Sequence, residues 1–349
     1  MSSFDRSALH LVTGGSGYFG SCLVRALANT GARVRLFDIN AADDLPEGVE
    51  FHQGDIRDPV SVEKAVDGAS FVYQNIALVP LAKDKNAFYA VNFQGMERLL
   101  RFAEKSGVKK VVYTSTSAVY GVPESNPVNE FSPRVPREDY GRSKLQAEQL
   151  CERLRQSGVP VSIIRPRTIL GVGRLGIFQI LFDWVSQGYN VPVFDGGRNL
   201  YQFVHAADLA DACIRAAASP GSEDFNIGAD RFGTMRELLE SLCRHAATGS
   251  KVRSVPMRPV EMAMKVTSGL GLSPLGPYHA MMYGRSLYFD VSKAKALLGW
   301  APRYSSAQMI MESYDWYLKN RAAILAQTGG SPHRSAVRQR ILRLVKHLL

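Results

Sequence analysis

The feature that most constrains the fold of this chain is a glycine-rich turn that directly follows an apolar run at residues 9–12: Thr13-Gly14-Gly15-Ser16-Gly17-Tyr18-Phe19-Gly20. Gly14, Gly17 and Gly20 have the spacing G-x-x-G-x-x-G. Glycines at this spacing let a strand and the next helix approach closely, and they leave amides at the helix N-terminus that can bind a pyrophosphate. The pattern predicts a strand at 9–12, a turn, and a helix over 20–30.

The next apolar segment, Val34–Phe37, predicts a second strand that ends at Asp38. An acidic residue about 20 positions after the glycine turn can accept hydrogen bonds from the adenosine ribose hydroxyls. The charge of Asp38 would also repel a 2′-phosphate, so we predict NAD as the cofactor. NADP stays the less favoured alternative, because Arg33 and Arg35 lie nearby.

Apolar strands continue to alternate with helical segments along the first half of the chain. We expect strands at 70–74, 110–114 and 159–164, and helices at 92–106 and 140–156. Alternation of this kind predicts an α/β fold with a doubly wound parallel sheet, that is, a Rossmann fold.

The pattern loosens after Pro166, and a strand around Phe203 with a helix from Asp208 is expected to return to the sheet. We predict an NAD-binding domain over 1–170, with 198–230 returning to it. A smaller, interleaved C-terminal substrate domain is expected over 171–197 and 231–326, and a linker and tail over 327–349. Residues 251–285 hold five of the ten methionines, which is typical of core packing or of a flexible apolar lid.

The net charge of +10 is concentrated in the tail, where residues 331–349 carry five Arg or Lys and no acidic residue. Apolar residues fall on one side of a predicted helix at 334–349 and basic residues on the other. Such a helix can contact an anionic membrane from the cytoplasmic side, and the alternative is that it docks on protein. The excess of positive charge is confined to the tail and accompanies no recognisable nucleic-acid-binding module, so no nucleic-acid partner is expected.

Length and composition describe a globular protein of about two domains, with 349 residues and 46% hydrophobic residues. No signal peptide or membrane-spanning run is visible, which predicts a cytoplasmic protein. The four cysteines lie far apart without a CxxC pair, so we expect buried thiols and no metal site.

Tyr140 and Lys144, in Tyr140-Gly141-Arg142-Ser143-Lys144, indicate the chemistry. Residues four apart lie on one helix face, so the ammonium of Lys144 can favour the ionised phenol of Tyr140. A tyrosine with that neighbour can act as an acid and a base in hydride transfer to a nicotinamide. The spacing alone also fits an ordinary exposed helix.

Over residues 8–318 the chain resembles the extended short-chain dehydrogenases/reductases, on the 3β-hydroxysteroid dehydrogenase-like branch of the NAD-dependent epimerase/dehydratase superfamily. The resemblance rests on the glycine turn, the Tyr/Lys pair and several later segments. These segments are Gly54-Asp55-Ile56-Arg57-Asp58, Tyr113-Thr114-Ser115-Thr116-Ser117-Ala118-Val119-Tyr120-Gly121, Arg165-Pro166-Arg167-Thr168-Ile169-Leu170-Gly171, Phe203-Val204-His205-Ala206-Ala207-Asp208 and Leu298-Gly299-Trp300.

The resemblance implies a site and a mechanism. Tyr140 would exchange a proton with the substrate oxygen, Lys144 would lower the pKa of Tyr140 and hold the nicotinamide ribose, and Thr116 would hydrogen-bond the same oxygen. Ser115 or Ser117 could serve in place of Thr116. Cofactor contacts are expected from Gly14, Ser16, Gly17, Tyr18, Phe19, Gly20, Asp38, Asp55, Ile56, Ala77, Asn92, Tyr140, Lys144, Pro166 and Thr168. Substrate contacts are expected from Ser117, Tyr201 and Arg285, and a homodimer is expected from the family.

The substrate class is less constrained. Sugar dehydratases carry Asp-Glu after the catalytic Thr, whereas this chain has Ser117-Ala118, which argues against dehydration. Tyr201 stands where many nucleotide-sugar enzymes have an arginine that helps to hold the diphosphate. The lack of this arginine argues against a nucleotide-sugar substrate, unless Arg198 or Arg285 compensates for it. We therefore favour an alcohol/ketone oxidoreductase acting on a sterol-like or 3-keto sphingolipid-like substrate. The alternatives are a nucleotide-sugar 4-epimerase or reductase, and a non-catalytic NAD-binding interaction protein.

Overall fold

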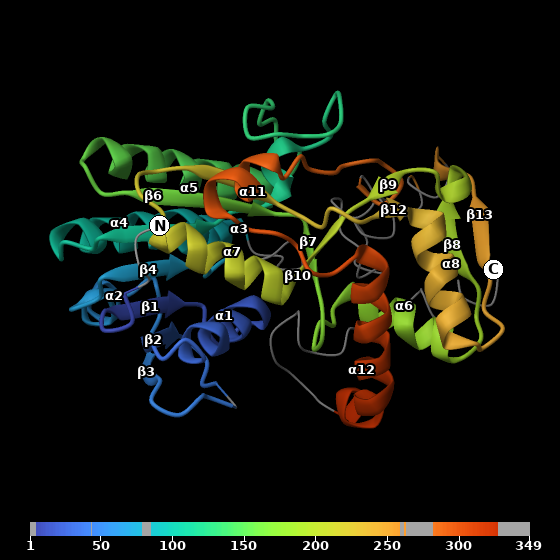
Figure 1. Cartoon of the computed structure of the whole chain (residues 1–349), viewed down its shortest axis with the longest axis horizontal. Coiled ribbons are helices and arrows are strands. Elements are labelled where there is room, and N and C mark those ends of the chain that lie inside the picture. The colour runs from blue at the N-terminus through green and yellow to red at the C-terminus, as the bar shows by residue number, and fades with distance from the viewer. Residues whose placement is uncertain (1–4, 43, 79–84, 259–261, 263–281, 327–349) are drawn as a thin grey trace.

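The structure, a computed structural model, describes residues 5–42, 44–78, 85–258, 262 and 282–326. One part of the molecule is built on a parallel seven-stranded sheet with the order β11-β6-β5-β4-β1-β2-β3, of which all strands but β11 come from the first half of the chain (Figure 1). The strands are β1 (Leu9–Thr13), β2 (Arg33–Asp38), β3 (Glu50–Gln53), β4 (Phe71–Gln74), β5 (Lys110–Thr114), β6 (Val161–Pro166) and β11 (Asp224–Ile227). The strand order reverses between β1 and β4, which places a ligand crevice at their carboxyl ends.

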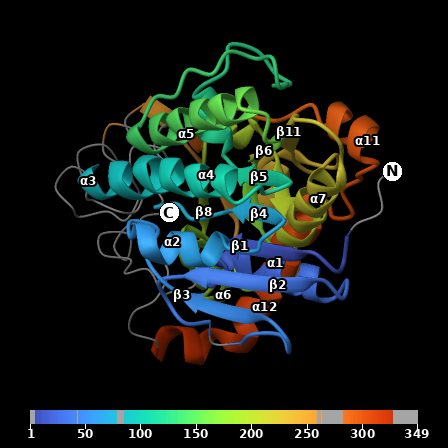
Figure 2. The ribbon, with the colours of Figure 1, turned by 90° about the vertical axis from the view of Figure 1, so that its left-hand side faces the viewer.

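Helices cover both faces of this sheet (Figure 2). One layer holds α1 (Tyr18–Ala28), α7 (Ala206–Ala218) and α11 (Ser292–Leu298), and the other holds α2 (Pro59–Val66), α4 (Met96–Lys105) and α5 (Asp139–Gln156). A separate hydrophobic core lies under each layer, which is why the central strands are apolar on both sides. The predicted doubly wound fold is therefore confirmed.

Several boundaries differ from the sequence prediction. Helix α1 begins at Tyr18 rather than at residue 20, and the aromatic side chains of Tyr18 and Phe19 in its first turn are buried. Strand β3 was not predicted, since Glu50-Phe51-His52-Gln53 has no apolar run and forms the edge of the sheet. The helix expected at 92–106 is preceded by α3 (Lys85–Phe88) and begins as a π-helix, η1 (Tyr89–Gly95), before α4.

The other part of the molecule surrounds a third hydrophobic core. Its helices are α6 (Ile177–Ser186), α8 (Met235–Ala246) and α12 (Ser306–Ala326), and its short strands pair two by two: β7 (Thr168–Leu170) with β10 (Phe203–His205), β8 (Val191–Phe194) with β13 (Val252–Val255), and β9 (Leu200–Tyr201) with β12 (Gly233–Thr234). The strand expected to return to the main sheet at Phe203 pairs with β7 instead, and this prediction was wrong. Strand β6 pairs with β5 on one side and with β11 on the other, so neither of its edges is free for β10, which pairs with the segment that follows β6.

A later segment of the chain, at residues 287–300, returns to the seven-stranded sheet. Leu287, Phe289 and Trp300 belong to the core under α1 and α7, and α11 packs on α7 and β11. The predicted substrate domain over 231–326 thus includes a segment whose buried side chains pack with the NAD-binding half. The indole of Trp300 donates to the carbonyl of Asp208 (2.9 Å), which ties this segment to the start of α7.

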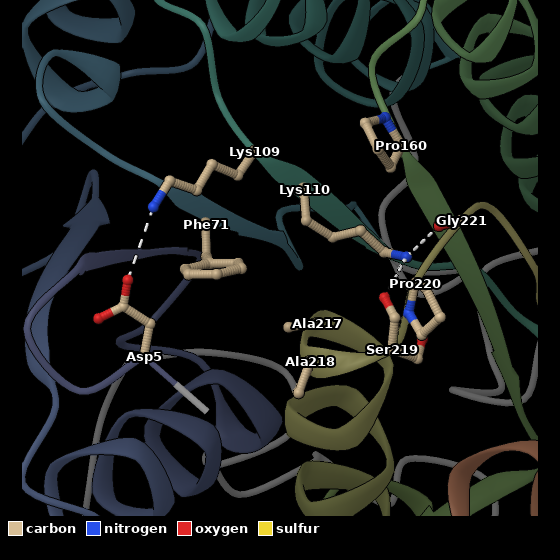
Figure 3. Close-up of a pocket in the computed structure, with 10 residues that line it drawn as sticks. All are labelled: Asp5, Phe71, Lys109, Lys110, Pro160, Ala217, Ala218, Ser219, Pro220 and Gly221. Atoms are coloured by element: carbon tan, nitrogen blue, oxygen red, sulfur yellow. Dashed lines mark hydrogen bonds and ion pairs between the residues drawn. The ribbon is translucent and has the colours of Figure 1, made fainter. Parts of the chain in front are cut away.

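The opposite, amino-terminal edge of the sheet carries a cavity of about 290 Å³ (Figure 3). Lys110, the first residue of β5, lies in it and is almost fully buried. Its ammonium donates to the carbonyls of Ser219 and Gly221, just after α7, so it closes the C-terminal end of that helix. The cavity contains none of the predicted site residues.

All four cysteines are free thiols, and three are buried, as expected. Among the described helices, none is both long enough and apolar enough to cross a membrane. The predicted tail helix at 334–349 and most of the methionine-rich segment lie outside the described residues.

Candidate active site

The predicted site residues gather at the carboxyl ends of the central strands. The glycine turn follows β1, Asp38 ends β2, Thr116 follows β5 and Thr168 follows β6. In a parallel sheet these ends share one edge, so residues far apart in sequence meet there.

Close contacts fix the glycine turn. Gly14 has φ +69°, and a Cβ there would lie 3.0 Å from the backbone nitrogen of Ile76. A Cβ at Gly20 would lie 2.0 Å from the carbonyl oxygen of Gly14, so only glycine lets α1 approach β1 this closely. The N-terminus of α1 has no side-chain cap and no acidic residue in its first turn. These amides and this cradle fit the pyrophosphate of a dinucleotide.

Asp38 is buried and held in place by backbone amides. Its carboxylate accepts hydrogen bonds from Ser16 N (3.1 Å) and Asn40 N (3.0 Å), so it is fixed between the glycine turn and the end of β2. Arg35 points elsewhere: its Nε pairs with Glu50 (2.9 Å) and its Nη1 donates to the carbonyl of Ala65. Arg35 is therefore committed to an ion pair rather than to the neighbourhood of Asp38, which fits NAD.

Asp55 and Ile56 follow β3 on the same edge. The Arg57 guanidinium hydrogen-bonds the carboxylate of Asp55 (2.9 Å) and holds its pKa below the usual range. Ile56 is buried against Gly95, where a Cβ would lie 2.8 Å from the Ile56 side chain.

Asn92 fastens the loop after β4, which contains Ala77. Its amide oxygen accepts from Leu78 N (2.8 Å), and its Nδ2 donates to Leu78 O (3.2 Å) and to Ser143 Oγ (3.1 Å). The side chain is buried and joins this loop to α5. Asn92 therefore positions the loop, a role that its sequence motif alone did not reveal.

The three residues expected to carry the chemistry come from two elements. Tyr140 and Lys144 lie one turn apart at the start of α5, whose N-terminus is capped by Glu138 through Tyr140 N (2.7 Å) and Gly141 N (2.6 Å). Thr116 lies just beyond β5 and caps a short 3₁₀ helix, η2 (Ser117–Tyr120). The ammonium of Lys144 donates to the carbonyl of Thr114 (2.6 Å), which ties α5 to the end of β5.

Lys144 is buried, with 2% of its surface exposed. Burial lowers its pKa to about 7, and the negative charge of Glu148 offsets only part of this effect. Its ammonium also lies 4.4 Å from the ring centroid of Tyr113. Lys144 is therefore a cation that titrates near neutral pH and has no carboxylate in direct contact among the described residues.

Three consecutive hydroxyls follow β5, and the structure separates their roles. Ser115 Oγ donates to the buried Glu148 (2.6 Å), and Ser117 Oγ accepts from Arg167 Nη1 (2.8 Å). Thr116 Oγ1 accepts only a weak local bond from Ala118 N (3.2 Å) among the bonds of the described chain. Ser115 and Ser117 are also buried whereas Thr116 is partly exposed, so the hydroxyl of Thr116 is the most accessible of the three to a substrate oxygen.

Behind the site lies an ion network that the sequence did not reveal. Arg165 donates to Glu148 through Nε (2.9 Å) and Nη2 (2.9 Å) and to Asp224 through Nη2 (2.6 Å). Arg134 adds a bond to Glu148 (2.8 Å). This network joins β6, β11 and α5 and holds α5 against the sheet.

Arg167 was quoted in a motif but not predicted as a site residue. It is 2% exposed, its Cζ lies 5.4 Å from the ring centroid of Tyr201, and its Nε is buried without a hydrogen-bond partner among the described residues. Thr168 Oγ1 lies 3.2 Å from the Tyr201 hydroxyl, so two of the predicted residues do meet here. A signal was present, since Arg167 is the second arginine within three residues at the end of a buried strand, where charged residues are rare.

Arg285, predicted for the substrate, lies in the segment beside β9, where Leu287 bridges to Tyr201. Asn199 Nδ2 donates to the carbonyls of Tyr283 (3.2 Å) and Arg285 (3.5 Å). Another arginine, Arg174, has its Cζ 5.5 Å from the ring centroid of Tyr18, and burial lowers its pKa to about 10. It was not predicted, and it brings a further positive charge to the cofactor side.

His205 and Asp208, landmarks of the sequence resemblance, have structural partners. His205 Nδ1 accepts from Ala207 N (3.2 Å) at the start of α7, and its Nε2 pairs with Glu312 (2.6 Å). The carboxylate of Asp208 accepts from Arg303 Nε (2.8 Å). These contacts join the start of α7 to α12 and to the residues just before α12.

Comparisons with known proteins agree with this geometry. The model of the NAD dependent epimerase/dehydratase family matches residues 10–228. The UDP-glucose 4-epimerase of Rhizobium leguminosarum bv. trifolii is 30% identical over 341 residues, covering 89% of this chain and 97% of that protein. An uncharacterized protein of Sinorhizobium fredii, y4nG, is 51% identical over 340 residues, covering 97% and 86%. The structure of the UDP-glucose 4-epimerase of Thermotoga maritima with UDP-glucose has a TM-score of 0.76 at 24% identity, covering 90% and 99%.

Proposed function

This chain belongs to the NAD-dependent epimerase/dehydratase family, and we propose that it is a nucleotide-sugar 4-epimerase. The similarity to a UDP-glucose 4-epimerase over nearly the whole of both chains, including the part that would bind substrate, carries the proposal. The sequence analysis favoured a lipid-like substrate and kept this function as its alternative. We now favour the alternative, because the named relatives act on UDP-sugars and no described residue distinguishes a lipid site.

In the proposed reaction, bound NAD supplies the hydride acceptor and donor at its nicotinamide. The phenolate of Tyr140 would take the proton of the sugar C4 hydroxyl when the hydrogen on C4 is transferred as hydride, and Thr116 Oγ1 would donate to the same oxygen. The resulting 4-keto sugar would rotate in the site and receive the hydride on its other face, while Tyr140 would return the proton. No NAD is consumed, because each turnover restores it.

The remaining residues would bind and position. Asp38 would hold the adenosine ribose, and Asp55 and Ile56 the adenine. Lys144 would hold the nicotinamide ribose and favour the ionised phenol of Tyr140. Arg285 and Arg198 would bind the diphosphate in place of the arginine that Tyr201 replaces.

The test is turnover of UDP-glucose and UDP-galactose by the purified protein, followed by chromatography of the nucleotide sugars. We expect Tyr140→Phe to lose about 10²- to 10⁴-fold in kcat while keeping bound NAD, because the proton acceptor is removed and the cofactor contacts stay. Tyr314→Phe, in the core under α12, is the matched control and should retain activity.

Full turnover by Tyr140→Phe would overturn the assignment of the base. If the wild-type protein ignored nucleotide sugars but oxidised a hydrophobic secondary alcohol, the lipid alternative would replace the epimerase. Bound NAD with no turnover of either class would favour a non-catalytic NAD-binding protein.

A further inference from the structure

Arg167 is a buried cation that the proposed reaction does not use. Its Nη1 donates to Ser117 Oγ (2.8 Å), and its buried Nε has no hydrogen-bond partner among the described residues. Within that same part of the chain, no carboxylate forms an ion pair with it. A buried guanidinium without an anion is costly, so this arrangement suits a site that receives the anion with its ligand.

Aromatic rings hold the guanidinium in place. Its Cζ lies 5.4 Å from the ring centroid of Tyr201 and 5.9 Å from that of Phe289. The contact with Ser117 adds a third restraint. Arg167 is therefore a restrained cation whose Nε edge still has a hydrogen bond to donate.

The position of Arg167 relative to the chemistry indicates which anion it meets. Ser117, its hydrogen-bond partner, directly follows Thr116, the residue proposed to bind the oxygen on C4. In a hexose linked to a nucleotide, the diphosphate is attached at C1, across the ring from C4. The ring neighbours of C4 are C3, which carries a neutral hydroxyl, and C5, which carries C6. Of the groups next to C4 only C6 can be a carboxylate, so a buried cation beside Thr116 suits an acid at that position.

We propose that Arg167 binds a carboxylate at C6, and that the preferred substrate is a nucleotide-linked hexuronic acid rather than a neutral hexose. The inference rests on the proposed function, since it assumes that Thr116 meets the C4 oxygen. A carboxylate accepts two parallel bonds from a guanidinium edge, which suits the unpartnered Nε. Ser117 and Tyr201 position this arginine.

The test compares UDP-glucuronic acid with UDP-glucose in the NAD-loaded enzyme. We expect the wild-type kcat/KM to be at least about 10-fold higher for the acid. Arg167→Met should lower kcat/KM for UDP-glucuronic acid by about 100-fold and for UDP-glucose by less than about 3-fold, because only the acid loses a charged partner. Arg167→Lys should fall between, since it keeps the charge and loses the fork.

Binding of UDP alone, measured by calorimetry, separates the two possible anions. If Arg167 met the diphosphate, Arg167→Met would weaken UDP and both sugars alike, and that result would overturn the proposal. Equal wild-type kcat/KM for the two sugars would also overturn it. Arg153→Met, on the exposed side of α5, is the matched control for loss of one positive charge.

The experiment also separates this inference from the proposed function. If the wild-type enzyme turned over neither sugar, the epimerase proposal would fail. Calorimetry would still compare the two sugars as ligands, and tighter binding of UDP-glucuronic acid that Arg167→Met abolishes would support the role of Arg167.

Discussion

Arg165 and Arg167 lie two residues apart at the end of β6, and both are almost fully buried, yet their surroundings are opposite. Arg165 contacts two carboxylates, Glu148 and Asp224, and although burial alone would lower its pKa, these partners raise it. Arg167 contacts a hydroxyl and two aromatic rings. The comparison teaches that burial of a cation does not define its role: a compensated charge stabilises the fold, whereas an uncompensated one is available to a ligand.

The largest effect is expected at the compensated arginine. Arg165→Met should lower the free energy of unfolding by about 3–5 kcal/mol, because it leaves Glu148 buried without its main partner. Urea denaturation measures the change. The double variant Arg165→Met/Glu148→Gln should recover part of the loss. A loss below about 1 kcal/mol in the single variant would remove the distinction between the two arginines.

Lys144 extends the comparison to a second cation that contacts no carboxylate within the described part of the chain. Its pKa is lowered from 10.5 in the unfolded chain to about 7 in the fold, so the unfolded state binds the extra proton between these values. The contribution of Lys144 to the free energy of unfolding therefore rises as the pH goes from about 7 to about 10.5. Below pH 7 its burial destabilises the fold by the full amount. Lys144→Met should thus stabilise the protein by about 2–4 kcal/mol at pH 6 and have little effect by pH 10.

The measurement is the difference in unfolding free energy between wild type and Lys144→Met across this pH range. Lys110→Met, at the far edge of the sheet, provides a control for which the unfolding free energy should change in the same direction. Burial lowers the pKa of Lys110 only to about 8, so its effect should be smaller. A difference for Lys144→Met that does not change with pH would show that its ammonium is compensated in the fold.

The smallest effect on stability is expected at Arg167. Arg167→Met should change the free energy of unfolding by about 1 kcal/mol or less, because the lost contacts are balanced by removal of an unpaired buried charge. Thermal unfolding of the NAD-loaded protein, with bound NAD quantified, measures this. A loss comparable to that of Arg165→Met would show that Arg167 is a structural residue, and its role in substrate selection would have to be reconsidered.

The parts of this molecule that could be predicted from sequence are those set by local pattern. The glycine spacing predicted the first strand–turn–helix unit, and alternating apolar runs predicted the central strands of the sheet. Edge strand β3 was missed because an edge needs few apolar residues. The partner of β10 was mispredicted because β11, which comes later in the chain, takes the place beside β6, and periodicity does not encode which strands pair.

The sequence by itself determined that this chain folds as a doubly wound sheet with a glycine turn for a dinucleotide and places Tyr140 and Lys144 on one helix face. These features depend on residues close together in the chain. Only the tertiary structure decided that Ser115 is engaged by Glu148, that Thr116 stays available, and that Arg167 pairs with no carboxylate among the described residues. The reason is physical: hydrogen bonding and charge compensation depend on which distant segments meet, and the partners of Arg165 lie 17 and 59 residues away.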